Sequence, residues 1–302
     1  MVSGNLLDMS EYADAFQELL QLIHLEPLEV NLFRGASRDI GTARVFGGQV
    51  LCQALLAASQ TVEQRLAHSL HGYFLRPGDP AAPIVYNVDR SRDGRSFSAR
   101  RVVAIQHGRP IFTLAASFQA AEQGLEHQFD MPAVPDPDAA RHSPPIDDQA
   151  LQQLPQIMRR WIDRFGPFEF RRVEHYDPFR PVPQAPRQHV WLRLHGELPD
   201  DPVLHRALLA YVSDFHLVGT ATLPHGLTWD EDSLVMASLD HAMWFHRSCR
   251  LDDWMLYACD SPSTSGGRGL SRGMIYDRTG RLVASTAQEG VIRRRRDGGK
   301  ED

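Results

Sequence analysis

The sequence predicts an α+β fold made of two tandem copies of one unit, in which an antiparallel sheet wraps around a long central helix. Three observations support this prediction: the second half of the chain repeats the first, each half contains one long and mostly apolar helical stretch, and tight turns separate the strands that follow it. A helix that is apolar on most of its circumference must be covered on several sides. A curved antiparallel sheet provides that cover.

The first block of the repeat reads "HSLHGYFLRPGD" (68–79) in one half and "ASLDHAMWFHRS" (237–248) in the other. In both copies a leucine and a histidine lead into an aromatic pair and an arginine. We expect both aromatic pairs, Tyr73–Phe74 and Trp244–Phe245, to lie in the core.

The second block reads "GRSFSARRVVAIQHGRPIFTLAASFQ" (94–119) and "GGRGLSRGMIYDRTGRLVASTAQEG" (266–290). In both copies a strand start rich in arginine and serine is followed by a Gly-Arg turn and a final strand of small residues. A repeat of this length indicates two copies of a domain-sized unit rather than a solenoid.

A stretch with helical spacing precedes the shared blocks in each half. It covers Gly47–Val62 in the first half, beginning with two glycines, and Pro202–Thr222 in the second. Apolar residues recur there at intervals of three and four, which predicts a helix. The strands that follow are joined by turns such as "RDGRS" and "DRTGR".

The region between the two copies predicts a linker. The stretch from Met131 to Gln156 is rich in proline, aspartate and alanine and begins without a helical or strand period. A chain of 302 residues fits two domains of moderate size. We therefore place an N-terminal unit at 1–130, a linker at 131–160 and a C-terminal unit at 161–302.

Composition excludes several classes of protein. The net charge of −6 argues against a nucleic-acid partner. The three cysteines are scattered without a CxxC pair, so neither a metal site nor a disulfide framework is indicated. No stretch approaches the roughly 18 apolar residues of a membrane span, and the first residues lack the pattern of a signal peptide. We expect a cytoplasmic protein without membrane association, cofactor or metal.

Two polar residues occur in otherwise apolar segments. Gln288 lies at the end of the strand "LVASTAQEGV" (282–291), and Asp214 lies in the second helical stretch. A polar group at a strand end is usually solvated, whereas an aspartate is costly to bury without partners. Neither residue alone establishes a site.

Seven segments of the chain resemble the type II acyl-CoA thioesterases, which are double hotdog proteins. The segments are "FRGASRDIGTARVFGGQV", "HSLHGYFLRPGD", "RDGRSFSARRVVAIQHGRPIF", "LLAYVSDFHL", "LPHGL", "LDHAMWFHR" and "LVASTAQEG". The resemblance implies a double hotdog fold, hydrolysis of fatty acyl-CoA to free fatty acid and coenzyme A, and a homo-oligomer. It also implies that Asp214, Ser238 and Gln288 jointly hold the attacking water. At Ser238 the family pattern commonly has threonine, so the hydroxyl is kept and a methyl group is lost.

These residue types suit thioester hydrolysis. Asp214 can accept the proton of the water, while Ser238 and Gln288 lack useful basicity but can fix the direction of the water by hydrogen bonds. Gly47 and Gly48 can present backbone N–H groups of a helix start to the thioester oxygen, or can simply allow close packing. His71 is a further substrate-binding candidate.

Two other functions remain open from the sequence. A hotdog-fold enoyl-thioester hydratase or dehydratase would use an Asp-His pair, and His216 follows Asp214 by two residues. On a helix, such residues face different directions, which argues against this pair. The chain can also be a non-catalytic acyl-CoA-binding protein. Because the first helix has no aspartate, we expect any chemistry in the second unit.

Two further groups of polar residues carry weaker signals. A Ser-His-Asp triad drawn from His71, Asp240, His241 or His246 lacks a GxSxG nucleophile turn and is disfavoured. The run Arg293–Arg296 fits a solvated tail, with contact to coenzyme A phosphates as the alternative.

Overall fold

A computed structural model describes residues 9–39, 44–140, 166–177, 181–227 and 234–294. Within these residues the secondary structure consists of three α-helices, one 3₁₀ helix and thirteen strands. The helices are α1 (Met9–Ile23), α2 (Gly47–Ser59), α5 (Pro202–Ser213) and the 3₁₀ helix η1 (Val218–His225). The strands are β1 (Leu25–Glu29), β2 (Leu32–Gly35), β3 (Leu66–Phe74), β4 (Ile84–Asp93), β5 (Phe97–Gln106), β6 (Arg109–Gln119), β7 (Phe168–Arg172), β8 (Arg187–Leu194), β9 (Leu234–Ser238), β10 (Asp240–Phe245), β11 (Met255–Ser265), β12 (Arg268–Asp277) and β13 (Leu282–Arg294).

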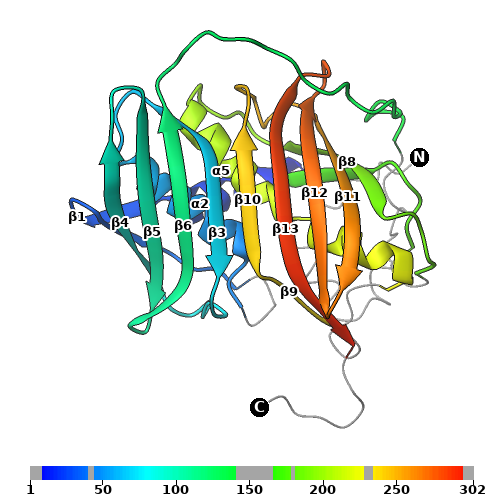
Figure 1. Cartoon of the computed structure of the whole chain (residues 1–302), viewed down its shortest axis with the longest axis horizontal. Coiled ribbons are helices and arrows are strands. Elements are labelled where there is room, and N and C mark those ends of the chain that lie inside the picture. Colours follow the sequence, from blue (N-terminus) through cyan, green and yellow to red (C-terminus); the bar gives the residue numbers. More distant parts are fainter. Residues whose placement is uncertain (1–8, 40–43, 141–165, 178–180, 228–233, 295–302) are drawn as a thin grey trace.

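All strands belong to one antiparallel sheet, in the order β1-β2-β4-β5-β6-β3-β10-β13-β12-β11-β8-β7, with β9 paired to β13 (Figure 1). Strands from each half of the chain therefore stay together. The halves join where β3 pairs with β10, and Tyr73 lies opposite Asp240 there. The expected arrangement of two helix-and-sheet units is visible, whereas the domain boundaries at 130 and 160 stay a prediction.

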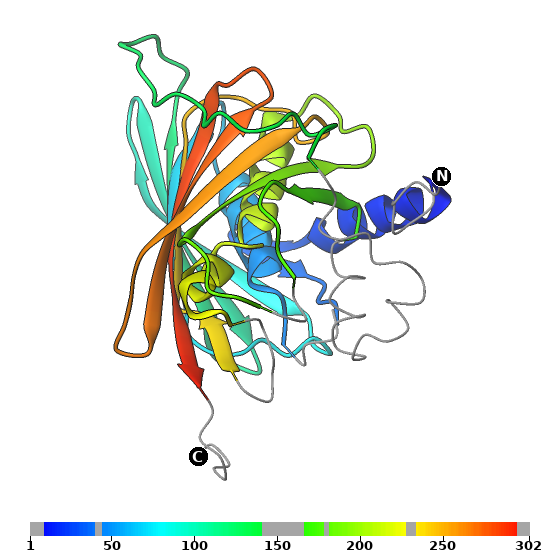
Figure 2. The ribbon, with the colours of Figure 1, turned by 90° about the vertical axis from the view of Figure 1, so that its right-hand side faces the viewer.

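Helices α2 and α5 lie next to each other on the same side of the curved sheet (Figures 1 and 2). Almost every residue of α2 is buried, as expected for a helix that a sheet wraps. The start of α2 lies against the last turn of α5. A Cβ atom on Gly48 would lie 2.2 Å from the carbonyl oxygen of Tyr211, so this contact requires glycine.

The second helix is shorter than expected. We expected helical structure over Pro202–Thr222, but α5 ends at Ser213 and Asp214 is its C-cap. His216 has a φ of 65°, which takes the chain out of the helix before η1 begins. The apolar spacing continues across this break, and spacing alone does not reveal a left-handed residue.

Both aromatic pairs were expected to lie in the core, but one ring of each pair is exposed. Tyr73 is 61% exposed and Trp244 is 38% exposed, whereas Phe245 is buried and Phe74 is partly buried. Successive residues of a strand point to opposite faces of the sheet. One ring of each pair must therefore point away from the helices.

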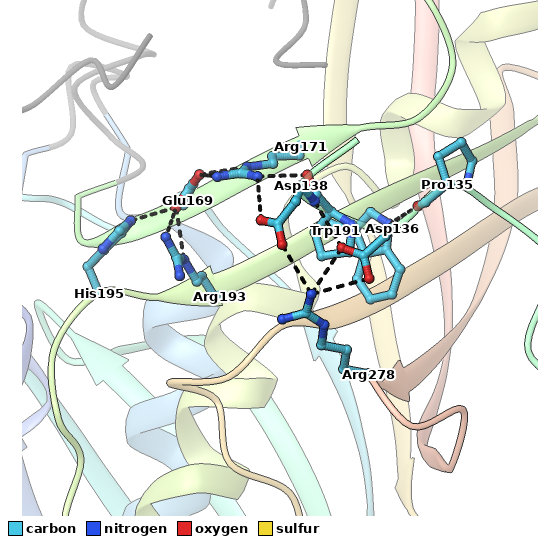
Figure 3. A network of polar contacts seen from close by, with 10 residues as sticks. Pro135, Asp136, Asp138, Glu169, Arg171, Trp191, Arg193, His195 and Arg278 are labelled. Carbon is cyan, nitrogen blue, oxygen red and sulfur yellow. Dashed lines mark hydrogen bonds and ion pairs between the residues drawn. The ribbon is translucent and has the colours of Figure 1, made fainter. Parts of the chain in front are cut away.

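The chain that follows β6 is fastened to the C-terminal half by a polar network (Figure 3). The indole N–H of Trp191 donates to the carbonyl oxygen of Pro135 at 2.9 Å. Arg278 contacts the carboxylates of Asp136 and Asp138 at 3.0 and 3.2 Å. The predicted linker thus packs against the sheet over its described part.

Glu169 connects the basic residues of this network (Figure 3). Its carboxylate accepts bonds from Arg171, Arg193 and His195, at distances of 2.7 to 2.9 Å. Arg171 and Arg193 each lie 4.6 Å from the ring centroid of Trp254. Burial raises the pKa of Glu169, but these bonds outweigh it and hold that pKa at about 2. The network therefore contributes to stability rather than to a site.

None of the helices in the described ranges is both long and apolar enough to span a membrane.

Candidate active site

Three side chains from distant segments of the C-terminal half meet at one point. The Nε2 atom of Gln288 donates to Oδ1 of Asp214 at 2.6 Å and lies 3.0 Å from Oγ of Ser238. Asp214 comes from the end of α5, Ser238 from the end of β9 and Gln288 from β13. These are the three residues for which the family resemblance implies one water-holding site.

Asp214 is also held by the N-terminal half of the chain. The backbone N–H of Gly48 donates to its carboxylate. A Cβ atom on Gly47 would lie 2.7 Å from Oδ2 of Asp214 and 3.0 Å from the ring of Phe74. No side chain of its own caps the start of α2. The N–H of Gly48 at that helix start is therefore used by the carboxylate, which is a favourable arrangement for an anion.

The environment of Asp214 makes it more basic than an ordinary aspartate. Its side chain is only 5% exposed. Burial raises the pKa of Asp214, while the hydrogen bonds from Gln288, Gly48 and Ser238 partly offset that rise by stabilising the ionised form. A raised pKa suits a group that has to accept a proton from water.

Gln288 is fully buried and points toward the helices from β13. Its Nε2 atom is used by Asp214 and Ser238, whereas its Oε1 atom has no hydrogen-bond partner among the described residues. A buried acceptor without a partner is uncommon and marks a place where a ligand can bond.

Ser238 is placed by the pairing of β9 with β13, in which it lies opposite Gly290. Its side chain is partly exposed, as is Gly47. Gly47 and Ser238 are therefore less buried than Gln288, which is fully buried. Serine in place of threonine keeps the hydroxyl within reach of Gln288.

The structure does not bring His71 to this cluster. Its side chain is exposed on the opposite face of β3 from the buried Leu70, and its ring packs against Trp244 at 5.2 Å. Strand alternation explains the outcome, since His71 and Leu70 must point to opposite faces. Substrate binding by His71 at this site therefore has no support from its position.

The other histidines and aspartate of the disfavoured triad are separated from one another. Oδ1 of Asp240 accepts the backbone N–H of Glu289 at 2.8 Å, and Nε2 of His246 contacts Oγ of Ser285 at 2.9 Å. Only His241 approaches the cluster, with Nδ1 at 3.9 Å from Oδ1 of Asp214. Its partner Ser213, at 3.0 Å, was not identified from the sequence. Its position directly before Asp214 was the available signal.

His216, the partner that the dehydratase hypothesis required, packs edge-on against Phe170 at 4.9 Å. Burial lowers its pKa to about 3, so the imidazole is neutral. Asp214 instead bonds to Gln288, Ser238 and Gly48. Within the described ranges, no group of three or more histidine, cysteine, aspartate or glutamate side chains is arranged to hold a metal ion.

Comparison with known proteins gives consistent results over both halves. Residues 168–291 match a family model described as acyl-CoA thioesterase, and residues 36–119 match the acyl-CoA thioesterase N-terminal domain. Acyl-CoA thioesterase 2 of Haemophilus influenzae is 42% identical over 282 residues, covering 93% of this chain and 99% of the relative. Acyl-coenzyme A thioesterase 8 of Homo sapiens is 42% identical and covers 90% of this chain and 88% of the relative.

Solved structures give the same result. The crystal structure of an acyl-CoA thioesterase II, TesB2, from Mycobacterium marinum aligns with a TM-score of 0.77 at 44% identity, covering 91% of this chain and 98% of that chain. A hot dog fold protein from Alicyclobacillus acidocaldarius aligns with a TM-score of 0.72 at 20% identity, which shows the fold alone. The double hotdog expectation is confirmed.

Proposed function

Since this chain belongs to the acyl-CoA thioesterase family and hydrolyses acyl-CoA, we propose that the reaction uses a water molecule held by Asp214, Ser238 and Gln288. The observation that carries this proposal is the position of Gln288. Its single amide nitrogen contacts both Oδ1 of Asp214 and Oγ of Ser238, so one small volume borders a base and two hydrogen-bonding groups.

In the proposed reaction, the water oxygen attacks the carbonyl carbon of the thioester while Asp214 accepts one of the water protons. The carbonyl oxygen gains charge in the tetrahedral intermediate. The C–S bond then breaks, the fatty acid is released, and the coenzyme A sulfur leaves as the thiolate or takes up a proton. The raised pKa of Asp214 favours the first step, since a more basic carboxylate abstracts the proton more readily.

The start of α2 supplies donors on the other side of the carboxylate. We propose that Gly48 holds Asp214 through its N–H and that the N–H of Gly47 faces the oxygen that gains charge. A helix start stabilises negative charge through its unpaired N–H groups. This assignment gives Gly47 and Gly48 different roles, whereas the sequence could only name them together.

The test is a single-turnover reaction of a saturated fatty acyl-CoA in H₂¹⁸O. Direct attack of water places ¹⁸O in the fatty acid in the first turnover, with one free thiol released per acyl group. An acyl-Asp214 anhydride hydrolysed at the Asp214 carbonyl would instead give unlabelled fatty acid and place ¹⁸O in the Asp214 carboxylate in the first turnover, with ¹⁸O reaching the fatty acid only on later cycles. That result would contradict the proposal.

The variant Gln288→Ala sharpens the same test. We expect kcat to fall by far more than acyl-CoA binding weakens, because Gln288 orients the water rather than holding the substrate. Turnover of an enoyl-CoA to a hydroxyacyl-CoA without thiol release would instead support the dehydratase function. Fatty acyl-CoAs of graded chain length define the preferred substrate in the same assay.

We further propose a homo-oligomer located in the cytoplasm. Exposed aromatic rings on the neighbouring strands β3 and β10, namely Tyr73 and Trp244, support self-association. The unpaired state of Cys52, Cys249 and Cys259 is consistent with a reducing compartment. Light scattering after gel filtration tests the first proposal, and a monomer would contradict it. Fractionation of the source cells tests the second.

A further inference from the structure

A buried histidine lies beside the Asp214 carboxylate without being bonded to it. His241, from β10, is 1% exposed, and its Nδ1 atom lies 3.9 Å from Oδ1 of Asp214. This distance is longer than a hydrogen bond. Nδ1 of His241 has no hydrogen-bond partner among the described residues. The proposed mechanism leaves this imidazole without a role.

The partners of Ser213 determine which nitrogen of His241 carries hydrogen. Oγ of Ser213 donates to the carbonyl oxygen of Ala210 at 2.9 Å, and a hydroxyl has only one hydrogen to give. At its second contact, 3.0 Å from Nε2 of His241, Oγ must therefore accept. Burial lowers the pKa of His241 to about 3, so the ring is neutral and carries a single N–H, on Nε2. Nδ1 presents its lone pair to Asp214.

An acceptor in this position treats the two states of Asp214 differently. It gives no hydrogen bond to the ionised carboxylate, but the protonated carboxyl can donate to Nδ1 after a movement of about 1 Å. A bond that only the protonated form can make favours that form. The protonated form is the one produced when Asp214 takes a proton from water.

We propose that Ser213 and His241 form a tautomer lock, which keeps a hydrogen-bond acceptor facing Asp214 and so prepares Asp214 to receive and hold the proton of the attacking water. Both are positioning residues that act through Asp214. The inference rests on the proposed role of Asp214 as the base.

The other groups around Asp214 do not obscure the effect of His241 on the protonation of Asp214. Besides His241, the titratable groups that act on Asp214 within the described ranges are Tyr211 from α5 and Tyr257 from β11, and burial raises the pKa of both, so they stay neutral. The carboxylate of Asp240, on β10, faces the backbone N–H of Glu289 instead. The groups that bond to the Asp214 carboxylate, from α2, β9 and β13, are uncharged.

The chain of contacts from Ser213 through His241 to Asp214 has the connectivity of a Ser-His-Asp triad, but its hydrogens are arranged in the opposite way. In a triad the aspartate accepts from Nδ1–H, and Nε2 accepts the serine proton. Here Ser213 is fully buried and its hydrogen is used by Ala210. Ser213 is therefore no nucleophile.

Nitrogen NMR of the protein with ¹⁵N-labelled histidine reads the tautomer directly. Long-range ring couplings of His241, assigned by its loss in His241→Phe, are expected to show hydrogen on Nε2 in the resting enzyme. Hydrogen on Nδ1 would overturn the proposal without reference to activity or to the stability of any variant.

The functional test is the pH profile of Ser213→Ala. Without an acceptor for Nε2–H, the other tautomer becomes favoured and Nδ1–H donates to the ionised carboxylate. The acidic limb of kcat/KM should then move to lower pH by about one unit. Ser213→Thr, which keeps the hydroxyl, should restore the wild-type limb. The matched control is Ser59→Ala, since Ser59 ends α2 and donates to Leu55 at 2.8 Å in the same way.

An unmoved limb in a folded Ser213→Ala, or an equal shift in Ser59→Ala, would overturn the lock. Failure of the proposed function would give a different result. Full activity in Asp214→Asn would show that Asp214 is not the base, whatever the tautomer of His241.

Discussion

The two long helices end in opposite ways, although they occupy corresponding places in the repeat. The end of α5 carries Asp214, whose carboxylate takes part in the cluster with Gln288 and Ser238. The chain after α2 is closed by Arg100, which is 2% exposed and donates to Oγ1 and the carbonyl oxygen of Thr61 at 2.8 and 2.9 Å. The end of α5 thus presents a carboxylate to the candidate site, whereas the chain after α2 is held by the buried side chain of Arg100.

The strand registers extend this difference to the sheet. Aligning the ends of β3 and β10 places Leu70 at the position of His241 and Ala116 at the position of Gln288. Arg100 lies opposite Ala116, just as Ser271 lies opposite Gln288. The first copy thus has apolar side chains and an arginine where the second has the site.

The starts of the two helices also differ, and here it is α2 that contributes to the cluster. At the start of α5, Asp201 accepts the N–H of Val203 at 2.9 Å, and Pro202 has no N–H. The start of α2 has no cap of its own and donates to Asp214. The copy that lacks the cluster side chains therefore still supplies a backbone donor to Asp214, and the proposed site draws on both copies.

The largest effect should come from replacing Asp214. Asp214→Asn is expected to lower kcat by about 10²- to 10⁴-fold, because it removes the general base. The matched carboxylate near the other helix end is Asp93, which bonds to Arg100 at 2.6 Å, and Asp93→Asn should keep wild-type kcat. Steady-state kinetics measure both. Comparable losses in the two variants would break the proposed contrast.

Asp214→Asn should lower kcat but should leave the free energy of unfolding unchanged or raise it. Burial raises the pKa of Asp214 above its unfolded value, so its contribution to stability is complete at low pH and is lost as pH rises through the folded pKa. At neutral pH the ionised group is therefore destabilising, and Asp214→Asn should unfold at an equal or higher urea concentration.

The next effect should come from the start of α2. Gly47→Ala places a methyl group 2.7 Å from Oδ2 of Asp214, so the carboxylate must shift. Displacing a reacting group by about 1 Å can cost about 10²-fold in rate. Gly219→Ala in η1 is the control, since no atom lies within 4 Å of its added Cβ. Wild-type kcat in a folded Gly47→Ala variant would show that the start of α2 takes no part in the reaction.

Arg100→Met should affect stability instead of rate. The change removes several charged hydrogen bonds from a buried position and should lower the free energy of unfolding by about 2–4 kcal/mol. Urea unfolding measures the loss, and the folded fraction should keep its kcat. Arg101→Met, at the exposed neighbouring position on β5, is the control. A fall in kcat with unchanged stability would indicate that the chain after α2 also takes part in chemistry.

The smallest effects should come from Ser238. Ser238→Ala removes one hydrogen bond worth about 1 kcal/mol, which corresponds to about a fivefold fall in kcat. Ser238 also bonds to Asp214 and lowers the pKa of Asp214, so loss of the hydroxyl should move the acidic limb of kcat/KM to higher pH. Ser238→Thr keeps the hydroxyl and should retain most of the activity. A limb that moves to lower pH in Ser238→Ala would contradict this electrostatic role.

Much of the site was predictable because the repeat and the family motifs fix which residues lie at strand and helix ends. Asp214, Ser238 and Gln288 were named from their segments, and the structure brings them together. His71 was misplaced because a motif does not state which face of a strand a residue occupies. Ser213 and His241 were missed as a pair, since their contact depends on how β10 crosses the end of α5.

Periodicity and repeat order, which are local properties of the chain, were enough to predict the two-copy architecture, the wrapped helices and the residue types available for hydrolysis. It took the tertiary structure to establish that α5 ends at Ser213, that the start of α2 donates to Asp214 and that the imidazole of His241 lies beside that carboxylate. These features depend on distances between segments far apart in sequence. Such distances are set by packing and strand register, which a one-dimensional pattern does not contain.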